Sequence, residues 1–102
     1  MDKEERDFFN VQKGIKYEKA GKDEKAIKVY EKLIAENFDG SHPYDRLCVL
    51  YRKQKNFTAE KYVLEKAILV FTQVAASGRP DGPPKLERYK KRLDIVHKKM
   101  LK

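Results

Sequence analysis

The stretch GIKYEKAGKDEKAI, residues 14–27, decides the fold of this 102-residue chain. Small and apolar side chains recur at spacings of three and four on both sides of Gly21, and this period predicts two helices. Glycine readily ends helices because it tolerates a left-handed backbone, and Asp23 is expected to cap the helix that follows. The stretch therefore predicts two antiparallel helices joined by a tight turn.

Similar signals outside this stretch predict three more helices. Asp2 is expected to cap the first helix of the chain and Ser41 the third, while Thr58 is expected to begin the fourth. Residues 77–84 hold three prolines and two glycines, which predicts a connector that no helix crosses. Residues 85–101 follow as a basic helix with one apolar face. The prediction is an all-α fold of about five helices, arranged as antiparallel hairpins.

The composition supports a single small domain, residues 1–102. The mass is 12.0 kDa with 40% hydrophobic residues, and strong helix formers supply nearly half of the chain. The single cysteine, Cys48, excludes an internal disulfide and is typical of a reducing compartment. No apolar run approaches the roughly 18 residues that span a bilayer, and no export signal follows the charged first residues. We therefore expect a cytoplasmic protein.

A comparison of the chain with itself reveals a period of 34 residues. Tyr17 and Tyr51 are separated by this distance, and so are the small residues Gly14 and Cys48. Helix and turn signals shift by the same amount. A fixed period of this length is typical of proteins built from stacked helical repeats.

Residues 7–74 resemble two tetratricopeptide repeats, whose 34-residue unit is a pair of antiparallel helices. The units would span residues 7–40 and 41–74. In this pattern, small residues such as Gly14 and Ala26 let the helices approach closely, while aromatic side chains fill the space around them. The resemblance implies a right-handed stack of helical hairpins.

Glu60 departs from this pattern, because it occupies in the second unit the place that Ala26 holds in the first. A carboxylate between packed helices is destabilising unless it is paired. We therefore expect Glu60 to bond to a nearby Arg, Lys or Tyr, or the fourth helix to be rotated so that Glu60 is exposed.

The predicted helix over residues 85–101 is a candidate cap, since two repeats alone bury little surface. Its apolar face would cover the fourth helix and consists of Leu86, Tyr89, Leu93, Val96 and Met100. The alternative is that this face is itself a docking site for a partner.

The sequence contains no motif for catalysis, metal binding or cofactor binding. Cys48 holds a small-residue position and is expected to pack as a compact hydrophobe. His42 is expected to be solvated in the first turn of the third helix, and His97 to border the apolar face of the last. We therefore expect no enzyme, no cofactor and no metal site.

The resemblance implies a protein-interaction module, an adaptor or scaffold, whose concave groove receives a peptide or a helix. The implied groove residues are Val11, Ile15, Glu18, Lys19, Asp45, Val49, Arg52 and Lys53. The aliphatic members would provide apolar contacts, and the basic members would orient an acidic group of the partner. Alternatively, the aliphatic members belong to the core. Weak self-association through the open first helix is a further expectation.

The net charge of +8 supports a second hypothesis, from a different class of function. Residues 78–102 carry nine basic and three acidic side chains, enough to attract nucleic acid, anionic lipid or an acidic protein. A nucleic-acid face directed at the phosphate backbone would consist of Lys85, Arg88, Lys91, Arg92, Lys98 and Lys99. With only Tyr89 available for stacking, a solvated charged face is the simpler interpretation. A membrane-surface or calmodulin-type partner ranks last, because aromatic anchors are missing.

Overall fold

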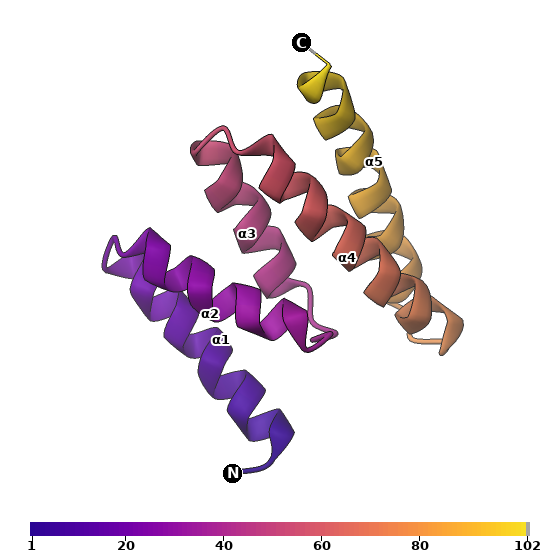
Figure 1. The fold of residues 1–102 in the computed structure, drawn as a ribbon. Helices are drawn as coiled ribbons and strands as arrows, with labels where there is room; N and C mark the ends of the chain where they lie inside the picture. The colour runs from indigo at the N-terminus through magenta and orange to yellow at the C-terminus, as the bar shows by residue number, and fades with distance from the viewer. Residues whose placement is uncertain (102) are drawn as a thin grey trace.

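The computed structural model describes residues 1–101, and within them it contains five helices and no strand (Figure 1). The helices are α1 (Lys3–Lys19), α2 (Asp23–Ala35), α3 (His42–Lys53), α4 (Phe57–Ala76) and α5 (Gly82–Met100). The prediction of an all-α fold with about five helices is confirmed. None of the helices in this described part of the chain is long and apolar enough to cross a membrane.

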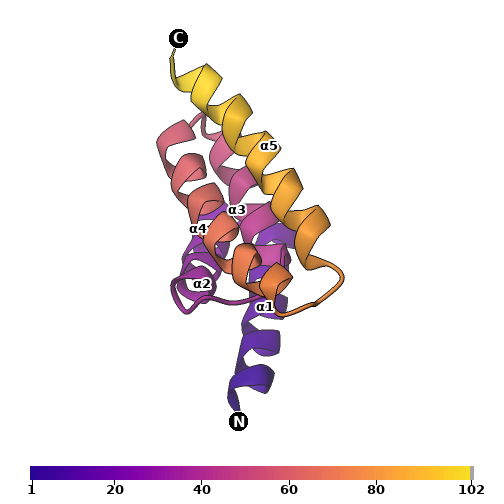
Figure 2. The ribbon, with the colours of Figure 1, turned by 90° about the vertical axis from the view of Figure 1, so that its right-hand side faces the viewer.

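The helices follow one another in a row, and each packs chiefly against its neighbours in sequence. α1 and α2 form a hairpin at one end of the row, α3 occupies the middle, and α4 and α5 form the other end (Figure 1). The most extensive contact joins α4 and α5. The side view in Figure 2 shows α5 in front of α3 and α4. The molecule is consequently thin in one direction, with extents of 44 × 37 × 18 Å.

Side-chain caps and left-handed glycines define several helix ends. Asp2 caps α1 as predicted, because its carboxylate accepts a hydrogen bond from the Glu5 N–H at 2.8 Å. Gly21 and Gly78 adopt φ angles of 72° and 88° just after α1 and α4. A side chain is strained in this conformation, so these glycines fix where the two helices end.

The predicted starts of α2 and α4 are each displaced by one residue. Asp23 is the first residue of α2 rather than its cap, and the cap position makes no side-chain hydrogen bond. α4 begins at Phe57 instead of Thr58, because the Asn56 side chain accepts a hydrogen bond from the Ala59 N–H at 3.1 Å. An acidic residue in the first turn still stabilises a helix through the helix dipole, which accounts for the signal at the start of α2.

The predicted connector, residues 77–84, is too long. α5 begins three residues earlier than predicted, at Gly82, and Pro83 and Pro84 lie in its first turn. Proline is tolerated there because the first N–H groups of a helix have no partner within the helix. A Cβ at Gly82 would come within 2.6 Å of the Ala75 backbone. Glycine at this position therefore lets the start of α5 contact the end of α4.

Aromatic side chains connect α3, α4 and α5. The rings of Tyr44 and Phe71 meet edge to face with centroids 5.9 Å apart, and Phe71 lies 5.4 Å from Tyr89. Tyr89 and Val96 of α5 are buried in the core, whereas Met100 near the end of the same face is 42% exposed. The apolar face of α5 therefore packs on α4 over most of its length.

Small residues occupy the contact between α1 and α2. Gly14 is buried, and a Cβ added to it would overlap the ring of Tyr30. Tyr30 has no room to move away, because it is fully buried and its hydroxyl donates to Glu18 at 2.7 Å. Ala26 of α2 is fully buried as well. These residues let the two helices lie close together.

We predict that Gly14→Ala lowers the free energy of unfolding by up to about 2 kcal/mol. Overpacking costs roughly 1–3 kcal/mol and outweighs the gain of up to about 1 kcal/mol from the higher helix propensity of alanine. Urea unfolding followed by circular dichroism measures the change. Lys16→Ala, at an exposed position of the same helix, is the control and should change stability by less than about 0.5 kcal/mol. A more stable Gly14→Ala variant would contradict the close contact.

Candidate partner-binding groove

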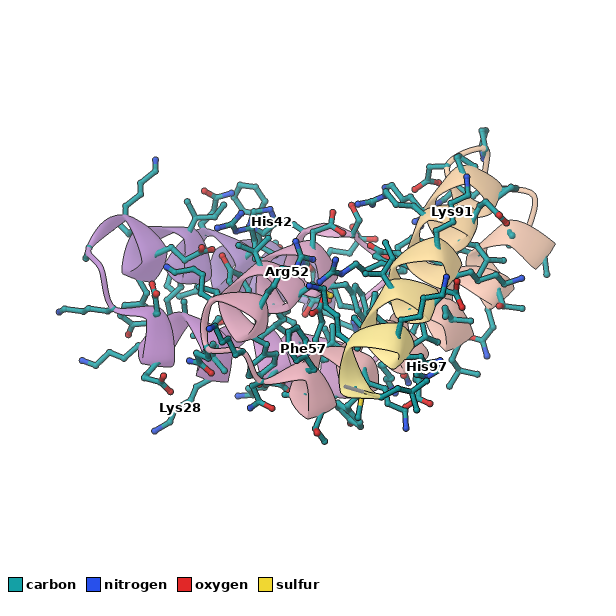
Figure 3. The ribbon with its side chains drawn as sticks, turned by 90° about the horizontal axis from the view of Figure 1, so that it is seen from above. Lys28, His42, Arg52, Phe57, Lys91 and His97 are labelled. Atoms are coloured by element: carbon teal, nitrogen blue, oxygen red, sulfur yellow. The ribbon has the colours of Figure 1, made fainter. Side chains whose placement is uncertain are left out.

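A hollow of about 270 Å³ opens between α3 and α5. It is lined by Asp45, Cys48, Val49, Arg52, Leu64, Arg88, Tyr89 and Arg92. The lining residues of α3 and of α5 recur at spacings of three and four, so each helix contributes one face. Figure 3 shows Arg52 on the side of α3 that faces α5. We call this hollow the α3–α5 groove.

The buried carboxylate of Glu60 lies beside this groove and holds two of its arginines. Glu60 of α4 is fully buried, and its Oε2 accepts from Arg52 Nη2 at 3.0 Å and from Arg92 Nε at 2.8 Å. A further bond joins Arg92 Nη2 to Oε1 at 3.1 Å. The expectation that Glu60 has a basic partner is confirmed. One carboxylate thus connects α3, α4 and α5 and offsets the cost of its own burial.

A second acidic group, Asp45 of α3, holds the other arginine of the groove. Arg88 Nη1 and the Tyr89 hydroxyl each donate to Asp45 Oδ1 at 3.0 Å. The Arg88 guanidinium also lies 4.9 Å from the centre of the Tyr89 ring. Burial, together with the nearby carboxylate of Asp45, raises the pKa of Tyr89, so its hydroxyl stays protonated and remains a donor.

The groove combines an apolar floor with an excess of positive charge. Cys48 and Leu64 are buried in the core beneath it. Burial raises the pKa of Cys48 to about 12, so the thiol stays protonated and serves as packing rather than as a nucleophile. Three arginines face two carboxylates, and the side chains of Arg52 and Arg88 are 42% and 53% exposed. Each therefore keeps N–H donors directed to solvent.

The structure brings three of the eight residues implied by the family resemblance, Asp45, Val49 and Arg52, to this groove. Val11 instead lines a separate hollow beside the α2–α3 loop. Ile15 and Lys19 line the outer side of α1. The remaining two, Glu18 and Lys53, form ion pairs with other residues of the chain, Glu18 with Arg46 and Lys53 at the surface. Lys53 Nζ, for example, lies 3.0 Å from Asp23 Oδ2.

Glu18 belongs to a polar cluster between α1, α2 and α3. Its carboxylate accepts from Tyr30 at 2.7 Å and from Arg46 Nη2 at 2.7 Å, while His42 Nε2 lies 3.3 Å from the Tyr30 hydroxyl oxygen. Burial alone would raise the pKa of Glu18, but the hydrogen bonds from Arg46 and Tyr30 outweigh it and lower the pKa. The prediction of a solvated His42 is wrong, because the imidazole is half-buried against the edge of Tyr30.

The residues predicted for a nucleic-acid face lie partly in the α3–α5 groove and partly on the outer surface of α5. Arg88 and Arg92 line the α3–α5 groove, as described above. Lys85 Nζ pairs with Asp81 at 3.0 Å, Lys98 pairs with Asp94 at 3.4 Å, and Lys99 lies 5.6 Å from the centre of the Phe57 ring. Lys91 projects from the outer surface of α5 (Figure 3). Most of these cations are therefore held by groups of the protein itself.

Sequence reasoning assigned Arg88 and Arg92 to an outer charged face of the last helix, whereas both line the α3–α5 groove, and it did not single out Arg46. A signal for the first two was present, because both lie within one turn of Tyr89 on the apolar face of α5. An arginine at the edge of a buried face is well placed to pair with a carboxylate such as Glu60. No comparable signal marks Arg46, whose partner Glu18 lies 28 positions earlier in the chain.

A scan against family models and searches of curated proteins and of solved structures found no match to this chain. Within residues 1–101, no group of three or more His, Cys, Asp or Glu side chains is placed to hold a metal ion. The chemistry available in the groove is that of its own residues: arginine donors, two carboxylates and an apolar floor.

We predict that Glu60→Gln lowers the free energy of unfolding by about 1–3 kcal/mol. The amide keeps the volume but loses the charge, leaving two guanidinium groups close together without their shared partner. The expected loss of stability is smaller than for a fully buried ion pair, because both arginines are partly exposed to solvent. Urea unfolding measures the change in the free energy of unfolding. The control is Glu65→Gln, at an exposed position of α4, whose free energy of unfolding should stay within about 0.5 kcal/mol of the wild-type value. Equal stabilities would contradict the role of Glu60.

We predict that acidification between pH 8 and 5.5 destabilises the protein partly through His42. Burial lowers the pKa of His42 below the ordinary value of 6.5, more than Glu18 raises it. The unfolded chain therefore binds the proton more tightly, and stability falls as the pH drops below about 6.5 until the lower folded pKa is passed. As the pH is lowered across this range, the melting temperature of the His42→Gln variant should fall less than that of the wild type. The melting temperature of the His97→Gln variant, which is changed on the exposed side of α5, should fall as it does in the wild type.

Proposed function

We propose that the chain is a non-enzymatic protein-interaction module that binds a peptide or helix with acidic and apolar side chains in the α3–α5 groove. The observation that carries the proposal is the convergence of Arg52 and Arg88, from two helices, on one hollow with an apolar floor. Such a site pairs a carboxylate of the partner with guanidinium donors while apolar side chains enter the hollow.

The ion pairs within the groove favour this function because they fix the arginines before a partner arrives. Glu60 holds Arg52 and Arg92, and Asp45 holds Arg88. A partner carboxylate then meets guanidinium groups whose side-chain entropy is already lost in part, which lowers the cost of binding. The small size of the groove limits the affinity, and we expect dissociation constants in the micromolar range.

We also propose that the fold is of the tetratricopeptide-like kind, with two hairpin units and α5 as the cap. The 34-residue period, the small residues Gly14 and Ala26 between α1 and α2, and the packing of α5 along α4 support this proposal. Peptide binding on the face formed by alternate helices is what such a fold implies.

We do not advance backbone-directed nucleic-acid binding as a second function. Four of its six candidate residues, Lys85, Arg88, Arg92 and Lys98, form ion pairs within the protein. The candidates also do not share one face, because Arg88 and Arg92 line the α3–α5 groove while Lys91 lies on the outer side of α5, so they could not follow one phosphate backbone together. The remaining candidates, Lys91 and Lys99, are more simply explained as part of a solvated, positively charged face of α5.

The test is selection from a displayed library of random peptides, followed by fluorescence anisotropy with the peptides selected. Selected peptides should be enriched in Asp or Glu next to aliphatic residues. Arg88→Gln should weaken binding about tenfold or more, because it removes a charged donor from the site. Lys91→Gln, an equal change of charge on the outer side of the same helix, is the matched control and should bind like the wild type.

Two results would contradict the proposal. Selected peptides without acidic residues would show that the arginines of the groove do not recognise the partner. Binding that both variants weaken equally would show that net charge rather than the α3–α5 groove governs capture. Circular dichroism of each variant confirms that it is folded. Arg88 suits this purpose because its partner Asp45 is partly exposed and keeps the Tyr89 hydroxyl as a donor.

A further inference from the structure

A second surface, on the outer side of α1, remains uncovered. Phe8 and Phe9 are adjacent in sequence and 67% and 57% exposed. Two hollows of about 400 Å³ and 380 Å³ follow the helix and share Phe9 as a lining residue. We call this surface the outer α1 face; besides the two phenylalanines it includes Glu4, Glu5, Gln12, Ile15, Lys16 and Lys19.

Charge and apolar character are ordered along this face. Glu4 and Glu5 lie in the first turn of α1, and Lys16 and Lys19 lie in its last turn. Among the lining residues between them only Lys13 is charged, and it lies toward the basic end together with Ile15, whereas the exposed phenylalanines lie toward the acidic end. A helix face that is acidic at one end and basic at the other is complementary to itself when a second copy runs antiparallel.

The register of such a pair follows from the spacing. Glu5, Phe9, Gln12, Lys16 and Lys19 recur at intervals of three and four, so they form one stripe along α1. If Gln12 lies on the two-fold axis, Glu5 is opposite Lys19 of the second copy. The same register brings Phe9 level with the second copy's Ile15, and Phe8 level with the aliphatic stem of its Lys16. The charged pairs then lie near the midline of the contact, and the apolar side chains flank them.

We propose that the chain forms a two-fold homodimer through the outer α1 face, with the two α1 helices antiparallel. The interface is small, because α1 has 17 residues and a helix rises about 1.5 Å per residue. The dimer is therefore weak, with a dissociation constant in the micromolar range or above. Its surface is separate from the α3–α5 groove, so this inference does not depend on the proposed function.

Charge exchange gives the decisive test, read by sedimentation equilibrium across the micromolar range. The wild type should show a monomer–dimer equilibrium. Glu5→Lys and Lys19→Glu should each weaken self-association about fivefold or more, because two-fold symmetry makes two repulsive pairs from one substitution. An equimolar mixture of the two variants should associate again, since each repulsive pair becomes an attractive one.

The mixture also separates the interface from effects on folding. Glu5→Lys removes an acidic residue from the first turn of α1 and lowers helix stability slightly, but mixing cannot repair that change. Phe9→Ala should reduce dimerisation at unchanged circular dichroism. Leu69→Ala, which alters an equally exposed apolar residue on α4, is the matched control and should dimerise like the wild type.

The proposal is overturned by any of three results. The first is a wild-type protein that stays monomeric at the highest concentration. The second is self-association that Phe9→Ala leaves unchanged, which would place the interface elsewhere. The third is a mixture of Glu5→Lys and Lys19→Glu that associates no better than either variant alone, which would exclude the antiparallel register.

Discussion

The burial of Glu60 is the constraint on which the C-terminal half of the molecule depends. A carboxylate with no exposed surface needs cationic partners, and it obtains them from α3 on one side and from α5 on the other. Arg92 thereby helps to fix the position of α5 along α4. One turn before Arg92 in α5, Tyr89 and Arg88 donate hydrogen bonds to Asp45 of α3. The groove between α3 and α5, and the orientation of its arginines, follow from one buried charge.

The period of the apolar residues was enough to predict the helices, and the turn residues were enough to locate most of their ends. Gly21 takes the left-handed backbone expected of it, Gly78 takes the same conformation after α4, and Glu60 has the basic partner that its burial demands. The errors at helix starts arise where several residues can provide the same stabilisation. Proline misled the prediction for residues 77–84, because it ends a helix in the interior but favours one in the first turn.

The candidate site was predictable only in part, because sequence spacing assigns a residue to a helix face but not to a neighbour. Asp45, Val49 and Arg52, which spacing assigns to one face of a helix, share the face of α3 that meets α5. Val11 and Ile15 share a helix face by the same arithmetic, yet they line different hollows, because the α2–α3 loop covers only one side of α1. Contacts between residues 28 to 44 positions apart decide such questions.

The arrangement of helices in a row has a consequence for how the chain folds. Because each helix packs chiefly against its neighbours in sequence, most native contacts close short loops. Chains of this kind have low contact order and fold quickly, on the microsecond to millisecond scale. The same linearity makes stability uneven, since the terminal hairpin of α1 and α2 can open while the aromatic cluster of α3, α4 and α5 stays packed. Hydrogen exchange in the first hairpin would then reflect its own opening rather than unfolding of the whole molecule.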